Sequence, residues 1–127
     1  MKSIGPKKIR TAVFISGTGS NLESLIKFSL KKRSPIEVIL IISNNTKAKG
    51  LKFAKLYKIK KKVYNYDKKK ISEKRILKDL KSNNIKLICL AGFMKILSKD
   101  FISKFNGKIL NIHPSLLPKY KLALIHI

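Results

Sequence analysis

The sequence contains a single cysteine, Cys89, so an internal disulfide bond is excluded. Cys89 lies within the apolar run 87–91, and we predict a buried, inert thiol. Long apolar segments are also missing: no run approaches the roughly 20 residues that span a bilayer. No apolar signal segment precedes the first predicted strand. We therefore expect a cytoplasmic protein that is neither exported nor inserted into a membrane.

Acidic side chains are scarce, because 6 Asp and Glu residues stand against 30 Lys and Arg residues, for a net charge of +24. So basic a chain attracts anions, and nucleic acid is one possible partner. Basic clusters occur at 31–33, 60–62 and 68–70, with tyrosines nearby that could stack on bases. However, we find no helix-turn-helix, zinc-knuckle or aromatic RNA-binding signature. We interpret the charge mainly as solvated surface that also steers anionic substrates.

Two kinds of apolar pattern alternate along the chain. Near-continuous apolar stretches predict buried strands, and apolar residues three or four apart predict helices. The predicted strands cover residues 9–15, 36–42, a short stretch at Val63, 86–91 and 107–110. The predicted helices cover residues 22–30, 51–57, 76–80 and 98–105. This order predicts an α/β protein with a doubly wound, mostly parallel sheet, in one domain of residues 1–127 whose residues 1–8 are frayed.

Residues 16–22, Ser-Gly-Thr-Gly-Ser-Asn-Leu, join the first predicted strand to the first helix. The two glycines let the backbone approach an anion. The amides of Gly19, Ser20 and Asn21 would point out of a helix N-terminus, whose dipole favours negative charge. The spacing matches neither the dinucleotide fingerprint nor the P-loop, which favours a phosphate monoester as ligand. The alternative is a tight turn in which Ser20 or Asn21 only caps the helix.

Residues 91–98 follow the fourth predicted strand. In a doubly wound sheet they face the phosphate loop across the switch point, where ligands bind. Gly92 permits close approach of a ligand, and the apolar residues of the loop could line a slot for a flat heterocycle. These apolar residues are Phe93, Met94, Ile96 and Leu97. The alternative is that they pack in the core.

Residues 111–118, Asn-Ile-His-Pro-Ser-Leu-Leu-Pro, follow the fifth predicted strand. The imidazole of His113 can transfer a proton near neutral pH, and the amide of Asn111 can donate a hydrogen bond to an oxyanion. Pro114 restricts the backbone beside them. This pattern is typical of a catalytic loop, although one His and one Asn in a loop are often structural.

Four segments, taken together, resemble one enzyme family. They are Gly-Thr-Gly-Ser-Asn-Leu (17–22), Ile-Ser-Asn-Asn (42–45), Leu-Ala-Gly-Phe-Met-Lys-Ile-Leu-Ser (90–98) and Leu-Asn-Ile-His-Pro-Ser-Leu-Leu-Pro-Lys-Tyr (110–120). From residue 9 to residue 120 the chain resembles the folate-dependent phosphoribosylglycinamide formyltransferases of purine synthesis. The resemblance implies a formyltransferase (Rossmann-like) fold. It also implies formyl transfer from 10-formyltetrahydrofolate, as cosubstrate, to the glycine amine of glycinamide ribonucleotide, without a metal. The alternatives are a basic nucleic-acid-binding module and a formyltetrahydrofolate deformylase.

The resemblance also implies roles for single residues. Asn111 would stabilise the oxyanion and His113 would transfer the proton. The ribonucleotide phosphate would bind Gly19, Ser20 and Asn21. The folate would contact Lys69, Met94, Lys95, Ile96, Leu97 and Asn111, while Gly92 and Pro114 would line the substrate site. Lys95 replaces an arginine common in the family, which keeps the charge and loses the bidentate fork.

The family continues with an aspartate-bearing loop that tunes the histidine, whereas residues 121–127 of this chain form a divergent tail. We expect a chain truncated after about the fifth strand, through a frameshift, a premature stop or fragmentation of the gene. Without the aspartate, the imidazolium of His113 lacks its partner, so we expect impaired transferase activity. We also expect the fifth strand to form an open edge of the sheet and the chain to aggregate.

Overall fold

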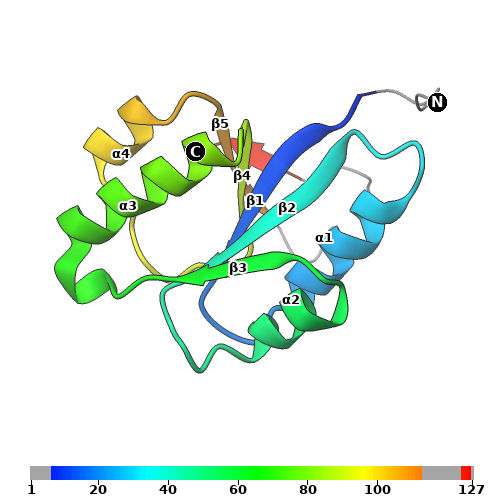
Figure 1. Ribbon diagram of the computed structural model, residues 1–127, viewed down its shortest axis with the longest axis horizontal. Helices are drawn as coiled ribbons and strands as arrows, with labels where there is room; N and C mark the ends of the chain where they lie inside the picture. Colours follow the sequence, from blue (N-terminus) through cyan, green and yellow to red (C-terminus); the bar gives the residue numbers. More distant parts are fainter. Residues whose placement is uncertain (1–6, 113–123, 127) are drawn as a thin grey trace.

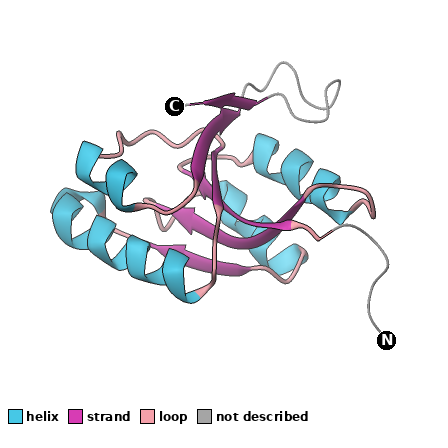
Figure 2. Ribbon diagram, turned by 90° about the horizontal axis from the view of Figure 1, so that it is seen from above, coloured by secondary structure: helices cyan, strands magenta, loops and turns pink. Residues whose placement is uncertain are grey.

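A computed structural model describes residues 7–112 and 124–126. It contains a six-stranded sheet in the order β3-β2-β1-β4-β5-β6, with helices on both faces (Figures 1 and 2). The strands are β1 (Ile9–Ile15), β2 (Ile36–Ser43), β3 (Lys60–Val63), β4 (Leu87–Leu90), β5 (Lys108–Ile112) and β6 (Leu124–His126). The helices are α1 (Ser20–Leu30), α2 (Lys52–Leu56), α3 (Lys69–Ser82) and α4 (Lys99–Lys104), with 3-10 turns η1 (Lys49–Leu51) and η2 (Tyr66–Lys68). The predicted doubly wound α/β fold is confirmed.

Strand β1 is buried on both faces because its alternate side chains enter two separate cores. Val13 and Ile15 pack with residues of α1 and α2 on one face of the sheet. Ala12 and Phe14 pack with residues of α3 and α4 on the other face, as the arrangement in Figure 1 shows. The strand order reverses between β1 and β4, so the switch point lies between these two central strands.

One edge of the sheet differs from the prediction. Strands β1 to β5 are parallel, but β6 pairs antiparallel to β5, with Asn111 opposite Ile125. The expectation that β5 forms an open edge is therefore wrong. A strand of three residues has too little alternation to be recognised from the sequence, and its pairing is decided by the neighbouring strand.

The opposite edge is strand β3, and its first three residues are exposed lysines, 60–62. Lysines on an edge strand discourage pairing with another chain, so part of the basic charge has a structural use. Across the part of the chain that the structure describes, no helix has both the length and the apolarity needed to cross a bilayer.

Cys89 is fully buried in β4. Burial raises the pKa of the Cys89 thiol to about 12, because a thiolate in apolar surroundings loses its hydration. The thiolate is the reactive form of cysteine, so this side chain is inert at neutral pH. The prediction of a buried, unreactive thiol is confirmed.

Candidate active site at the carboxyl edge of the sheet

The loop after β1 ends at a helix N-terminus whose N-cap residue is a glycine. Gly19 is the N-cap of α1, has a left-handed backbone with φ of 73°, and makes no side-chain capping hydrogen bond. The first helical hydrogen bond runs from the Glu23 N–H to the Gly19 carbonyl at 3.0 Å, so the amides of Ser20 and Asn21 have no partner within the helix. The alternative in which Ser20 or Asn21 caps the helix is wrong. Amides in this arrangement, together with the helix dipole, suit an anion.

The phosphate loop, residues 16–21, packs against η1 through a close contact between two glycines. A Cβ placed on Gly19 would lie 2.6 Å from the Cα of Gly50. The Gly50 N–H also donates to the Gly17 carbonyl at 2.9 Å. The loop therefore depends on a backbone contact with a residue that follows a different strand. Only a side chain as small as hydrogen allows this contact.

Ser16 connects three loops at this edge of the sheet. Its hydroxyl donates a hydrogen bond to Asn44 Oδ1, in the segment after β2. The same hydroxyl accepts a hydrogen bond from the Met94 N–H at 2.8 Å, in the loop after β4. Ser16 is only 8% exposed, so the connection is largely shielded from water. As the switch-point argument predicts, the phosphate loop and the loop after β4 are neighbours.

The loop after β4 (residues 91–98) contributes three residues to the core, of which Ala91, 4% exposed, packs on the face of α1 and α2 and the other two on the opposite face. The ring of Phe93 makes edge contacts with Phe14 and Tyr66, at centroid distances of 5.3 and 5.6 Å. Leu97 is 8% exposed and belongs to the core between the sheet and helices α3 and α4. The alternative of core packing therefore holds for Phe93 and Leu97, and the Leu97 side chain is committed to that packing.

Gly92 and residues 94–96 of the same loop face solvent. Met94 and Ile96 are 79% and 80% exposed, and Lys95 between them is also exposed. Gly92 begins this part of the loop with a φ of 74°. Two large apolar side chains beside a cation form a surface that a flat, partly apolar ligand could cover. Core packing is thus not the role of Met94 or Ile96.

Lys69 is the first residue of α3 and is half-exposed. It lines a groove between α3 and α4 together with Glu73, Ser98 and Phe101. Ser98 is the residue at which the loop after β4 ends and α4 begins. The fold therefore brings Lys69 to one end of the loop that carries Met94 and Ile96.

Asn111 lies near the carboxyl end of β5 and is exposed. It pairs in parallel register with Leu90, the last residue of β4, which places it beside the start of the loop after β4. His113 and Pro114 lie outside the described residues, so their roles stay predictions. Within the described ranges, no three or more His, Cys, Asp and Glu side chains gather closely enough to hold a metal ion.

Three residues that organise these loops were not predicted. Ser16 and Gly50 act through contacts between distant segments, and no local pattern reveals such contacts. Glu73 did carry a signal, because it shares helical spacing with Ile76 and Leu80 on the buried stripe of α3. An acidic residue on an apolar stripe has to find hydrogen-bond donors, so its position alone indicates a specific role.

Comparison with known proteins gives one consistent match. A family model described as "Formyl transferase" matches residues 9–125. Over 126 residues the chain is 44% identical to the trifunctional purine biosynthetic protein adenosine-3 of Gallus gallus, covering 97% of this chain and 13% of that protein. Over 117 residues it is 44% identical to the phosphoribosylglycinamide formyltransferase of Haemophilus influenzae, covering 90% of this chain and 54% of that enzyme.

The fold also has a close counterpart among solved structures. The crystal structure of phosphoribosylglycinamide formyltransferase from Brucella melitensis superposes with a TM-score of 0.80 and 40% sequence identity. The superposition covers 90% of this chain and 61% of that chain. The chain therefore spans less than two thirds of the length of each of these relatives.

Proposed function

Because this chain belongs to the formyl transferase family, we propose that it acts in formyl transfer from 10-formyltetrahydrofolate to the glycine amine of glycinamide ribonucleotide. The relatives named for this activity and for purine biosynthesis support the choice of substrate. The observation that carries the proposal is the Ser16 hydroxyl, which joins the predicted phosphate loop to the predicted folate loop. The reaction would be a step of de novo purine (IMP) synthesis in the cytoplasm.

The proposed binding mode assigns one loop to each substrate. The ribonucleotide phosphate binds the backbone amides of Gly19, Ser20 and Asn21 at the start of α1, together with the side-chain hydroxyl of Ser20 and the side-chain amide of Asn21. The folate lies against the loop after β4, at Met94, Lys95, Ile96 and the backbone of Leu97, and reaches Lys69. Gly92 and Pro114 line the space where the two substrates meet. The net charge of +24 favours both ligands, because each carries phosphate or carboxylate groups.

The proposed chemistry is acyl transfer through a tetrahedral intermediate. The glycine amine attacks the formyl carbon, and the carbonyl electron pair moves onto the oxygen. The side-chain amide of Asn111 donates a hydrogen bond to that oxyanion. The intermediate then collapses, the bond to N10 of the folate breaks, and N10 receives a proton. His113 transfers this proton from the attacking amine to N10.

Phosphate binding is tested with the double substitution Ser20→Ala and Asn21→Ala. A hydrogen bond to a charged group contributes about 1.5–3 kcal/mol, so each lost contact weakens binding of glycinamide ribonucleotide roughly tenfold or more. Titration calorimetry of the chain with the ribonucleotide gives the Kd. The matched control is Ser82→Ala with Asn106→Ala. These two exposed residues of the same types precede β4 and β5, at the amino ends of the strands. Equal Kd values for both double variants would contradict a role of the Ser20 and Asn21 side chains in phosphate binding.

Asn111 is tested through its preference for the formyl group. A neutral hydrogen bond contributes about 0.5–1.5 kcal/mol, so wild-type chain should bind 10-formyltetrahydrofolate about two- to tenfold more tightly than tetrahydrofolate. In Asn111→Ala this preference disappears, while tetrahydrofolate itself binds as before. Fluorescence titration of both folates measures the two Kd values. A chain that binds neither folate nor ribonucleotide would contradict the proposed function as a whole.

A further inference from the structure

Glu73 is the only one of the six acidic residues, all of which the structure describes, that is buried, with 6% of its surface exposed. It lies on α3, on the stripe of that helix that also buries Ile76 and Leu80. A carboxylate in such a position is costly unless strong hydrogen bonds compensate for the lost water. Its partners therefore indicate why an acid occupies this position.

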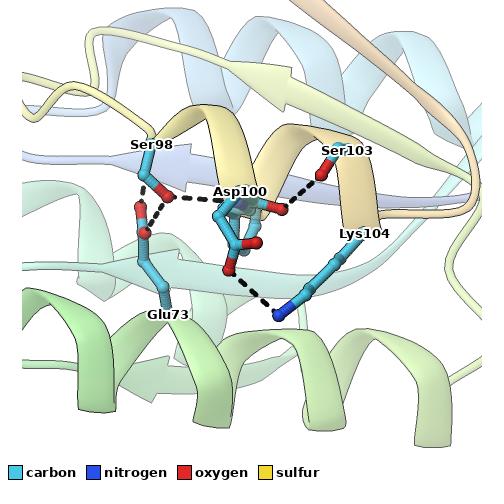
Figure 3. Close-up of polar contacts among 6 residues, drawn as sticks. Glu73, Ser98, Asp100, Ser103 and Lys104 are labelled. Carbon is cyan, nitrogen blue, oxygen red and sulfur yellow. Dashed lines mark hydrogen bonds and ion pairs between the residues drawn. The ribbon is translucent and has the colours of Figure 1, made fainter.

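Both oxygens of Glu73 accept hydrogen bonds, and two of the three donors belong to one residue. Oε1 accepts from the Ser98 hydroxyl at 2.6 Å, and Oε2 accepts from the Ser98 backbone N–H at 3.1 Å (Figure 3). Oε2 also accepts from the Tyr66 hydroxyl at 3.3 Å. The Ser98 hydroxyl in turn accepts from the Phe101 N–H at 3.0 Å and so caps α4. Glu73 thus fixes the residue at which the loop after β4 ends.

The other end of this loop is fastened in a similar way. The Ala91 N–H donates to the Phe14 carbonyl at 2.9 Å, and the Met94 N–H donates to Ser16 Oγ at 2.8 Å. Between these contacts and Ser98 lie the exposed residues of the loop, which are Met94, Lys95 and Ile96. The loop is therefore held at both ends, while the side chains of Met94, Lys95 and Ile96 are exposed and do not anchor it in the core.

We propose that Glu73 is a positioning residue for folate. By holding Ser98, it fixes the loop conformation that presents Met94, Lys95 and Ile96 to the ligand. Lys69 lies one helical turn before Glu73 and lines the same groove, so the contact also sets the loop relative to this second folate residue. A loop ordered before binding loses less conformational entropy when the ligand arrives, and its affinity is higher. This inference rests on the proposed function, because it takes the ligand of the loop to be folate.

The test compares Glu73→Gln with a matched control, Glu23→Gln. A glutamine cannot satisfy all three donors, because one carboxylate oxygen becomes an NH₂ group. Glu23 likewise accepts a tyrosine hydroxyl, that of Tyr57 at 3.0 Å, but lies on α1, which packs on the other face of the sheet. Glu73→Gln should bind 10-formyltetrahydrofolate at least tenfold more weakly, with little change in affinity for ribose 5-phosphate. Glu23→Gln should bind the folate as wild type does.

Hydrogen exchange provides a readout that does not require a ligand. In Glu73→Gln the amides of residues 94–101 should exchange at least tenfold faster, while those of β1 keep their protection. Faster exchange throughout both cores would mean a general structural role and would overturn the inference. Ser98→Ala should reproduce the effect, and the double variant should lose less than the sum of the two single losses, because the single variants share the hydrogen bond between the Ser98 hydroxyl and Glu73.

The outcomes also separate the inference from the function on which it rests. If the wild-type chain binds folate and Glu73→Gln binds it equally well, the positioning role is overturned and the proposed function stands. If the wild-type chain binds no folate, the proposed function fails and the inference fails with it. If Glu73→Gln binds folate more weakly and loses exchange protection only at residues 94–101, the result supports both the positioning role and the proposed function.

Discussion

Replacing Phe14 with alanine is expected to lower the free energy of unfolding by about 3–5 kcal/mol, the usual cost of deleting a buried phenylalanine ring. Phe14 is 0% exposed and lies in the central strand β1. Its ring makes edge contacts with Phe93 and Phe101, at centroid distances of 5.3 and 6.4 Å. Truncation of the ring removes packing between the sheet and helices α3 and α4 and leaves a cavity there. The loss is a large share of the stability of a small domain.

Urea unfolding followed by circular dichroism measures this change as a shift of the transition midpoint at constant slope. Leu30→Ala is the matched control, because Leu30 is 66% exposed and its truncation should change stability by less than about 0.5 kcal/mol. Phe14→Ala should also weaken folate binding, since Phe93 belongs to the loop after β4. An unchanged midpoint for Phe14→Ala would show that β1 is not the centre of the core.

The sequence was sufficient to predict those elements whose burial is continuous. In strand β1 and helix α1 the buried positions are apolar except for Thr11 and Ser29, so hydrophobic periodicity identifies both elements directly. Strand β6 could not be predicted, because three residues do not define a period and β5 decides whether they pair. The same limit applies to β3, whose lysines give no apolar signal and whose position was marked only by Val63.

The candidate site was predictable as a set of loops but not as a set of contacts. Glycines, amides and an imidazole after successive strands indicate which loops meet, because parallel strands end at one edge. The hydrogen bond between Ser16 and Met94 joins residues 78 positions apart, and no local pattern contains that information. Phe93 and Met94 belong to one residue class, yet one packs in the core and the other is exposed. The backbone course of the loop decides which of the two side chains is buried, and the sequence alone does not give that course.

Gly19→Ala is expected to combine the loss of phosphate binding with a loss of stability. The alanine would occupy a left-handed backbone, φ 73°, and its Cβ would lie 2.6 Å from the Cα of Gly50. The left-handed backbone costs an alanine about 1–2 kcal/mol of stability. The collision costs about 1–3 kcal/mol more, because backbone atoms can move little. The displaced segment carries the amides assigned to the phosphate, so binding of ribose 5-phosphate should weaken more than tenfold. Titration calorimetry and thermal unfolding measure the two effects.

Alanine substitutions at three further glycines separate the cost of backbone strain from the cost of a steric collision. Gly50→Ala adds a collision alone, because its Cβ would lie 2.8 Å from the Cα of Gly19 at an ordinary φ. Gly92→Ala adds strain alone, with a φ of 74° and nothing within 4 Å of its Cβ. Gly17→Ala adds neither, so its stability should match that of the wild type. Gly50→Ala should lose phosphate affinity as Gly19→Ala does, whereas Gly92→Ala should lose stability and keep that affinity.

The phosphate affinities of Gly50→Ala and Gly92→Ala together show whether η1 holds the phosphate loop in place. Gly50 follows β2 and contributes no amide to the assigned phosphate site, so it acts on the phosphate through its contacts with Gly19 and with the side chain of Ile15 and through its hydrogen bond to Gly17. Weaker phosphate binding in Gly50→Ala, with normal binding in Gly92→Ala, would mean that η1 sets the position of the anion-binding amides. If Gly50→Ala instead binds phosphate as tightly as wild type, the loop holds its shape without η1. The free amides of α1 would then suffice for the anion, and the close contact of the two glycines would serve packing alone.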